Sequence, residues 1–355
     1  MSGAGELTAV GRLIEAAVVS GGVPGAVAAV GCHSDTLAMY VAGLADTTPG
    51  AERAMTEGTV FDVASLTKAV ATATVTLALA GDRRLELDAA VTGYLPPARW
   101  PSSVTIRHLL AHTSGLPASV KFYQRCDTRD QVLRELYRTP LDAPPGTEVV
   151  YSDLGFMVLG EIVAAVAGER LDVAVRHLVT APLRMNSTGF NPSGPRQRFA
   201  ATEPSEDGVP RTGVVHDENA SAMGGVAGQA GLFSTVADLA RFAQWWVGPE
   251  DGPVPVWLRQ AATACQTPGL AGCRGLGWVR QGDRYDILGG TWPPASVSHT
   301  GFTGTSIALD SASGLWVVLL TNAVRLGRDA TAIKSLRRAV HAAAAPLASP
   351  GSIVG

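Results

Sequence analysis

The sequence predicts an α/β (α+β) fold in which an antiparallel sheet, assembled from both ends of the chain, is flanked by helices and carries a mostly helical inserted region. Three observations support this prediction. Strand-like runs occur near both ends of the 355 residues, helical periodicity dominates between them, and an amphipathic segment stands at each end. No repeat or low-complexity linker interrupts the chain. We therefore expect one domain over 1–355, with an α/β part (1–60 plus 270–355) and a mainly helical part (61–269).

The N-terminal elements follow from periodicity. Apolar residues at helical spacing predict an amphipathic helix over about 6–20, which the Gly- and Pro-rich segment 21–25 ends. Apolar runs at 26–32 and 37–44 are then joined by three polar residues, His33, Ser34 and Asp35. This pattern indicates a β-hairpin.

The middle of the chain is dominated by helical patterns. Residues 69–80 contain no charge, Gly or Pro and are rich in Ala and Leu, which predicts a helix buried on all sides. Further helices are expected at 105–117, 129–138, 154–168, 171–180 and 235–247, the last opened by a capping-box-like Thr235-x-x-Asp238. Strands are expected again at 275–280, 285–288, 296–300, 305–310 and 315–321, before a final helix at about 329–344.

Composition excludes several classes of protein. The net charge is −3 and the basic residues are scattered, which argues against a nucleic-acid partner. The longest apolar run is too short to span a bilayer, so we expect no membrane partner. The N-terminus lacks the basic and apolar regions of a secretory signal, and we expect a cytoplasmic protein.

The four cysteines, Cys32, Cys126, Cys265 and Cys273, lack metal-ligand spacing. In a reducing compartment they are expected to be free thiols packed as small apolar groups. A disulfide between Cys265 and Cys273 would matter only in an exported protein.

The first candidate catalytic pair is Ser65 and Lys68, three residues apart at the start of the apolar segment 69–80. This spacing places both side chains on one face of a helical turn. A desolvated lysine favours its neutral form and would then take the proton of the serine hydroxyl. The alternative is an ordinary N-cap serine beside a solvated lysine.

The second candidate is Tyr151-Ser152-Asp153, where a loop meets the apolar segment 154–168. A phenol beside an ammonium can act as general base or acid, and Asp153 can accept a hydrogen bond from the lysine or the substrate. The alternative is a packed tyrosine ring and an aspartate that caps the following helix.

The third candidate is His299-Thr300-Gly301-Phe302, at the end of an expected strand. Because Gly301 has no Cβ, an acyl substrate would have room against the strand edge. The backbone amide of Phe302 would then join that of Ser65 as an oxyanion hole. The alternative is a plain glycine-rich turn.

Taken together, these three motifs resemble those of the serine β-lactamase and penicillin-binding-protein superfamily. The likeness extends to segments 108–117, 215–220 and 224–242 and covers about 8–345. It is closest to the class C-like branch, which includes D-alanyl carboxypeptidase-type enzymes, family VIII esterases and acyltransferases of natural-product pathways.

The resemblance implies an acyl-enzyme mechanism without metal or organic cofactor. Ser65 becomes the acylated nucleophile, Lys68 its base or proton relay, and Tyr151 the second proton-transfer group. The amides of Ser65 and Phe302 become the oxyanion hole. We also expect His299 to be catalytic, and Asp153, Thr300, Gly301 and Tyr123 to contact the substrate.

Two positions depart from the β-lactamase pattern. Asp153 stands where these enzymes usually have Asn, and His299 stands where they usually have Lys. A histidine near its reference pKa of about 6.5 is mostly neutral at cytoplasmic pH, and an added carboxylate disfavours anionic ligands. We therefore expect poor β-lactamase activity and a preference for esters, amides or thioesters of less acidic substrates.

Several other clusters are assigned structural roles. His216-Asp217-Glu218 is expected to be a hydrogen-bonded loop, because adjacent residues cannot easily face one ion. His108 and His112 are expected to be a core and a surface histidine and not a metal pair.

The aromatic residues Phe122, Tyr123 and Trp292 are expected to line the acyl pocket.

The expected function is a serine hydrolase that forms an acyl-Ser65 intermediate from an ester or amide of a small molecule. One alternative is an acyltransferase that passes the acyl group to an alcohol or amine in place of water. The other is a non-catalytic sensor that is acylated, or merely binds, without turnover.

Overall fold

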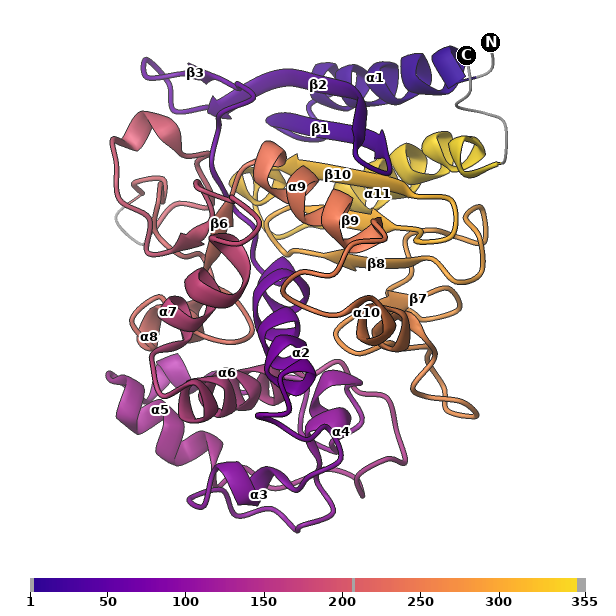
Figure 1. Cartoon of the computed structure of the whole chain (residues 1–355). Coiled ribbons are helices and arrows are strands. Elements are labelled where there is room, and N and C mark those ends of the chain that lie inside the picture. The colour runs from indigo at the N-terminus through magenta and orange to yellow at the C-terminus, as the bar shows by residue number, and fades with distance from the viewer. Residues whose placement is uncertain (1–2, 206–207, 350–355) are drawn as a thin grey trace.

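The computed structural model describes residues 3–205 and 208–349 and has an antiparallel seven-stranded sheet with strand order β3-β2-β1-β10-β9-β8-β7 (Figure 1). The N-terminal hairpin, β1 (Gly25–Cys32) and β2 (Asp35–Asp46), joins the C-terminal strands through the pairing of β1 with β10 (Leu315–Thr321). The other strands are β3 (Arg53–Ala54), β7 (Val279–Arg280), β8 (Val297–Thr300) and β9 (Ser306–Leu309). The predicted fold class is confirmed.

The central strands of the sheet are buried on both faces. In β1, Val27 and Ala29 point into one core cluster, whereas Ala28 and Val30 point into another. This alternation is the two-residue period of a strand. The second cluster is covered by α1 (Gly3–Val19) and α11 (Thr331–Ala344), and α9 (Val236–Val247) packs on the opposite face.

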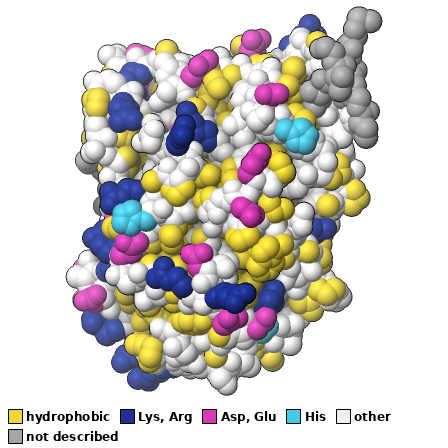
Figure 2. Space-filling model, viewed as in Figure 1, with side chains coloured by type: hydrophobic (Ala, Val, Ile, Leu, Met, Phe, Trp, Pro, Cys, Tyr) yellow, Lys and Arg dark blue, Asp and Glu magenta, His cyan; other side chains and the backbone are white. Residues whose placement is uncertain are grey.

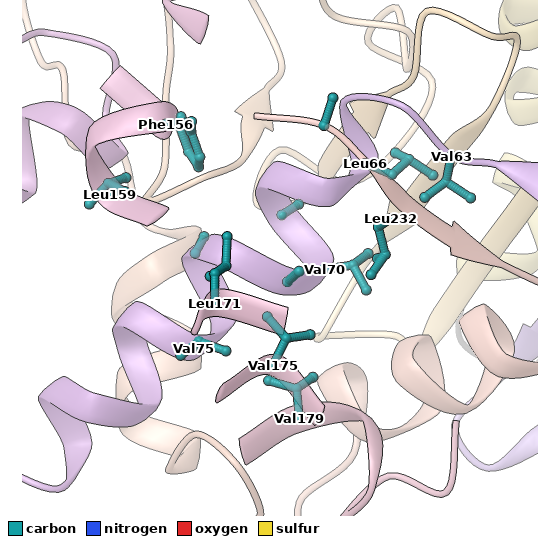
Figure 3. Packing of buried hydrophobic residues seen from close by; sticks show 14 of the residues in the cluster. Val63, Leu66, Val70, Val75, Phe156, Leu159, Leu171, Val175, Val179 and Leu232 are labelled. Carbon is teal, nitrogen blue, oxygen red and sulfur yellow. The ribbon is translucent and has the colours of Figure 1, made fainter. Parts of the chain in front are cut away.

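The helical region lies below the sheet in Figure 1 and surrounds a buried central helix, formed by η1 (Lys68–Ala73) and α2 (Thr74–Gly81). All residues of 69–79 are buried, as predicted. Figure 3 shows Val70 and Val75 packed among side chains of α6, α7, η3 and β6. The surrounding elements are α3 (Val91–Tyr94), α4 (Ile106–Leu110), α5 (Arg129–Leu136), α6 (Asp153–Ala167), α7 (Leu171–Val175), η3 (Arg176–Thr180), α8 (Glu218–Ala222) and α10 (Val256–Thr263).

A small second sheet connects this region to the catalytic motifs. Its strand order is β4 (Phe61–Asp62), β6 (Leu232–Ser234) and β5 (Gly189–Phe190). Because β4 immediately precedes Ser65, this sheet fixes the direction from which the chain enters the central helix.

One predicted strand is wrong. Residues 285–288 form turns and no strand, because Asp283 accepts a hydrogen bond from the Tyr285 amide (2.8 Å) and Asp286 accepts one from the Leu288 amide (2.7 Å). Such local side-chain bonds compete with strand pairing. The predicted strand at 275–280 is reduced to β7, and α10 was not predicted.

The surface carries charges of both signs. On the face shown in Figure 2, acidic and basic side chains are interspersed with apolar atoms. Among the described residues, none of the helices combines the length and apolar character that crossing a membrane requires.

Gly228 is the position where we expect a minimal substitution to disturb the helical region. A Cβ there would lie 1.9 Å from Phe156 O and 2.9 Å from Gly160 N of α6. We expect Gly228→Ala to lower the free energy of unfolding by about 2 kcal/mol or more, as overpacking does. Urea unfolding would measure it, with Gly93→Ala, where nothing lies within 4 Å, as control. Equal stability of the two variants would contradict the prediction.

Candidate active site

Ser65 stands at a strained turn between β4 and the central helix. The preceding residue, Ala64, has a φ of +47°, which a residue with a Cβ adopts at a cost. The Ala64 amide donates to Asp62 Oδ1 (2.8 Å), and the other oxygen of that carboxylate accepts from the His216 amide (2.7 Å). Buried Asp62 therefore ties the serine turn to the 216–218 loop.

Lys68 is completely buried, and its ammonium makes three contacts. Nζ donates to Ser65 Oγ (3.0 Å) and to Gln229 O (3.0 Å), and it lies 2.7 Å from Asp153 Oδ1. A lysine ammonium has three N–H donors, and the Tyr151 hydroxyl is a further hydrogen-bond partner, so no donor is left for solvent. The alternative of a solvated lysine is thereby excluded.

The charge of Lys68 differs from the expectation. Burial lowers its pKa, but the Asp153 carboxylate and Tyr151 together raise it further, and the net pKa lies above the ordinary lysine value. The expected neutral amine is therefore wrong for the resting site. Because the ammonium donates to Ser65 Oγ, another group has to take the serine proton.

Asp153 is free to pair with Lys68 because it does not cap α6. The helix is capped by Ser152, whose Oγ accepts from the Gly155 amide (3.1 Å). The Asp153 side chain is 29% exposed, so one side of the ion pair reaches solvent.

Tyr151 is half-buried in a cluster of rings and cations. Its ring centroid lies 5.0 Å from Lys68 Nζ, 4.6 Å from the His112 ring and 6.1 Å from the His299 ring. Tyr151 and Ser65 thus contact the same lysine, which brings the first two motifs together in one site.

His299 is buried and neutral. Burial first, and then the positive charges of Lys68 and Arg274, lower its pKa to about 3. Its Nδ1 lies 3.0 Å from Thr300 O, a bond that requires the proton on Nδ1 and leaves Nε2 as an acceptor. The third motif therefore carries no positive charge of its own.

The turn from β8 to β9 is fastened directly to the serine turn. Thr303 Oγ1 donates to Asp62 O (2.7 Å), and Thr305 Oγ1 donates to Val63 O (3.0 Å). A Cβ on Gly301 would lie 2.3 Å from Val63 O. The expected reason for this glycine is therefore wrong: the space is filled by the chain before the nucleophile, and the glycine permits that close approach.

These hydrogen bonds between the β8–β9 turn and the serine turn support the expected oxyanion hole. Within the described residues, neither the Ser65 amide nor the Phe302 amide donates a hydrogen bond. The Phe302 side chain is 54% exposed and stacks on the His216 ring at a centroid distance of 5.6 Å. Buried Arg337 of α11 holds the same turn by donating to Gly301 O (2.5 Å) and Thr305 O (2.8 Å).

The 216–218 loop makes several structural hydrogen bonds. His216 Nε2 lies 3.0 Å from Glu203 Oε2, and Glu218 pairs with Arg328. Asp217 caps α8 by accepting from the Ala220 amide (2.7 Å). Among the described residues, no group of three or more His, Cys, Asp or Glu side chains is arranged to hold a metal ion.

The structure does not bring the three expected aromatic residues together at the site. Phe122 is buried in the core of the helical region, and Trp292 is buried on the far face of the sheet, where its Nε1 donates to His341 O. Neither belongs to the site, so both expectations are wrong. Tyr123 lines a cleft of about 300 Å³ together with Glu218, but Ser65, Lys68 and Tyr151 do not line that cleft, so its substrate contact stays a prediction. Thr300 is half-buried on β8.

The cysteines are free thiols, as expected, but they are not all packed inside. Cys32 and Cys126 are buried, whereas Cys265 is exposed, and its Sγ lies 3.5 Å from that of Cys273.

Three residues of the site were not predicted from the sequence. The carbonyl of Gln229 holds Lys68, and its segment was noted only as part of the family likeness. His112 was expected to be an ordinary structural histidine, yet it packs against the Tyr151 ring. Arg274 gave no local signal, because its contact with Tyr151 joins positions far apart in the chain.

An antiparallel sheet of this order, with a buried central helix entered at Ser65, defines the fold of β-lactamases and transpeptidases. The chain belongs to the beta-lactamase family, whose model matches residues 10–342. It is 33% identical over 302 residues to a putative D-alanyl-D-alanine carboxypeptidase of Escherichia coli K12, an alignment that covers 75% of this chain and 70% of that protein.

Solved structures show the same fold. "EstCE1, a hydrolase with promiscuous acyltransferase activity" superposes with a TM-score of 0.78 at 23% identity, covering 95% of this chain and 98% of the other. A class C beta-lactamase superposes with a TM-score of 0.75 at 22% identity, covering 96% of each chain. Membership of the beta-lactamase family, indicated by the motifs, is confirmed by the family model and by the 33% identical relative.

Proposed function

We propose that the protein is a serine hydrolase that cleaves an ester or amide of a small molecule through an acyl-Ser65 intermediate. One observation carries the proposal: the three contacts of Lys68 Nζ, which fix a buried ammonium against Ser65 Oγ. The names of the relatives support it, since one is described as a carboxypeptidase and another as a hydrolase with acyltransferase activity.

In the proposed reaction, Ser65 Oγ attacks the carbonyl carbon and its proton passes to anionic Tyr151, because the Lys68 ammonium has no free acceptor. The carbonyl oxygen becomes an oxyanion held by the amides of Ser65 and Phe302. Tyr151 then gives its proton to the leaving group as the acyl-serine forms. Water, or another acceptor, later attacks the acyl carbon as it loses its proton to Tyr151, and Tyr151 returns that proton to Ser65 Oγ as the bond between the serine and the acyl group breaks.

The test is turnover of p-nitrophenyl esters of graded chain length, combined with intact-mass measurement. We expect p-nitrophenolate release, a transient adduct at Ser65 and no activity in Ser65→Ala, whereas the exposed Ser102→Ala behaves as the wild type. A persistent adduct without turnover would instead indicate an acylated sensor. Faster product release on adding alcohols or amines would indicate an acyltransferase.

We expect β-lactams to be poor substrates. The third motif offers neutral His299 where a cation would hold the carboxylate, and Asp153 adds a negative charge nearby. A hydrogen bond to a charged group contributes about 1.5–3 kcal/mol, so kcat/KM for nitrocefin should fall roughly ten- to a hundred-fold below that for the best ester. Comparable kcat/KM values for the two substrates would contradict this prediction.

A further inference from the structure

We propose that Arg274 is a positioning residue for Tyr151, holding its ring and supplying the positive charge that favours its proton-accepting, anionic state. The inference rests on the proposed function, in which Tyr151 takes the proton of Ser65. Arg274 lies outside the three motifs, in the segment between α10 and β7.

The geometry around Arg274 places its guanidinium against two tyrosine rings. Its central carbon lies 5.4 Å from the Tyr151 ring centroid and 5.3 Å from that of Tyr285, and the two rings are themselves 5.1 Å apart. Asp283 holds the guanidinium in place, because Arg274 Nη2 donates to Asp283 Oδ1 at 2.8 Å. The arginine is 1% exposed, so packing fixes its position and water does not screen its charge.

Arg274 has donor nitrogens that make no hydrogen bond to the described residues. Nε and Nη1 are buried and have no hydrogen-bond partner among the described residues. A buried donor without a partner is costly, and a native structure retains one where the charge serves a purpose. Burial lowers the pKa of Arg274, and the negative charge of Asp283, followed by the interaction with Tyr151, opposes that lowering, so the guanidinium and the phenol oxygen attract each other.

The histidines around Tyr151 do not supply this charge. Both histidines, His112 and His299, have pKa values lowered by burial, with the charge of Arg274 a further cause, and they are neutral. The Lys68 ammonium also faces Tyr151, 5.0 Å from its ring centroid, but it shares its charge with Asp153 at 2.7 Å. Arg274 is therefore a second cation beside Tyr151, in addition to Lys68, that can stabilise a developing phenolate.

Two substitutions with opposite expected signs test the inference. Arg274→Gln removes the cation, so the acid limb of the kcat/KM profile for a p-nitrophenyl ester should move to higher pH by about one unit or more. Asp283→Asn keeps the arginine and removes its counter-charge, so the limb should move to lower pH. The control is Arg284→Gln, because exposed Arg284 contacts the outer side of Tyr285 (4.8 Å) and should leave the profile in place.

A merely structural role for Arg274 predicts a different result. Loss of packing would lower kcat/KM in both variants without shifts of opposite sign, and that outcome would overturn the inference. Arg274→Lys keeps the charge but cannot stack between two rings, so we expect it to restore the pH profile better than kcat.

A titration without substrate separates this inference from the proposed function. Phenolate absorbance, taken as the difference between each protein and its Tyr151→Phe counterpart, should appear at higher pH in Arg274→Gln than in wild type. If the wild type forms no adduct and turns over no ester, the proposed function fails, and the titration still decides the role of Arg274. Coincident titration curves for wild type and Arg274→Gln would refute it.

Discussion

Replacement of Lys68 by Met is expected to lower kcat/KM for p-nitrophenyl esters by about a thousand-fold, in the range of general acid–base effects, while the protein stays folded. The ammonium is held between Ser65 Oγ and Asp153, so its loss removes both the donor that orients the nucleophile and the charge beside Tyr151. Steady-state kinetics would measure the loss, and circular dichroism would monitor the fold.

The fold should survive because the group left behind can reach water. The Asp153 side chain is 29% exposed, so without Lys68 it becomes hydrated instead of remaining as an unpaired buried charge. Lys121→Met, at an exposed lysine, is the matched control and should keep full activity. Substantial esterase activity in Lys68→Met would show that the ammonium is not part of the reaction.

Local patterns were sufficient for much of the fold. The uncharged segment 69–80 is apolar on every side, and a helix with that pattern is stable only when buried, which is how η1 and α2 lie. The strand runs at 26–32 and 315–321 are likewise continuous and apolar, and they pair at the centre of the sheet. In each case the element's own residues determine its environment.

The charge state of the site was not predictable in this way. Lys68 was expected to be neutral because burial alone favours the neutral amine, but the balance depends on Asp153, 85 residues away in the chain. Similarly, the role of Gly301 depends on the carbonyl of Val63. Such long-range contacts leave no local pattern in the sequence.

The second large effect concerns acid stability. Burial lowers the pKa of His299 and His341 to about 3 and lowers that of His112 well below the usual value. In the unfolded chain each histidine titrates near pH 6.5. Between pH 6.5 and about 3 the unfolded state therefore binds more protons, and the free energy of unfolding falls as the pH decreases.

A single substitution isolates the contribution of one histidine to this pH dependence. His341 is fully buried between α11 and the sheet, away from the catalytic residues, with Nε2 3.1 Å from Ser306 Oγ. In His341→Gln, the loss of unfolding free energy below pH 6 should be smaller by about 1.4 kcal/mol per pH unit than in wild type.

Urea unfolding at half-unit intervals from pH 7.5 to 4.5 would measure this difference. The buried carboxyls Asp62, Asp217 and Glu161, whose pKa values are raised by burial, oppose the loss in both proteins, so they cancel when the two curves are subtracted. Exposed His33 provides the control, His33→Asn, since Asn tolerates its φ of +51°. Parallel curves for wild type and His341→Gln would mean that His341 accepts its proton in the folded state, which the apolar surroundings of that ring make unfavourable.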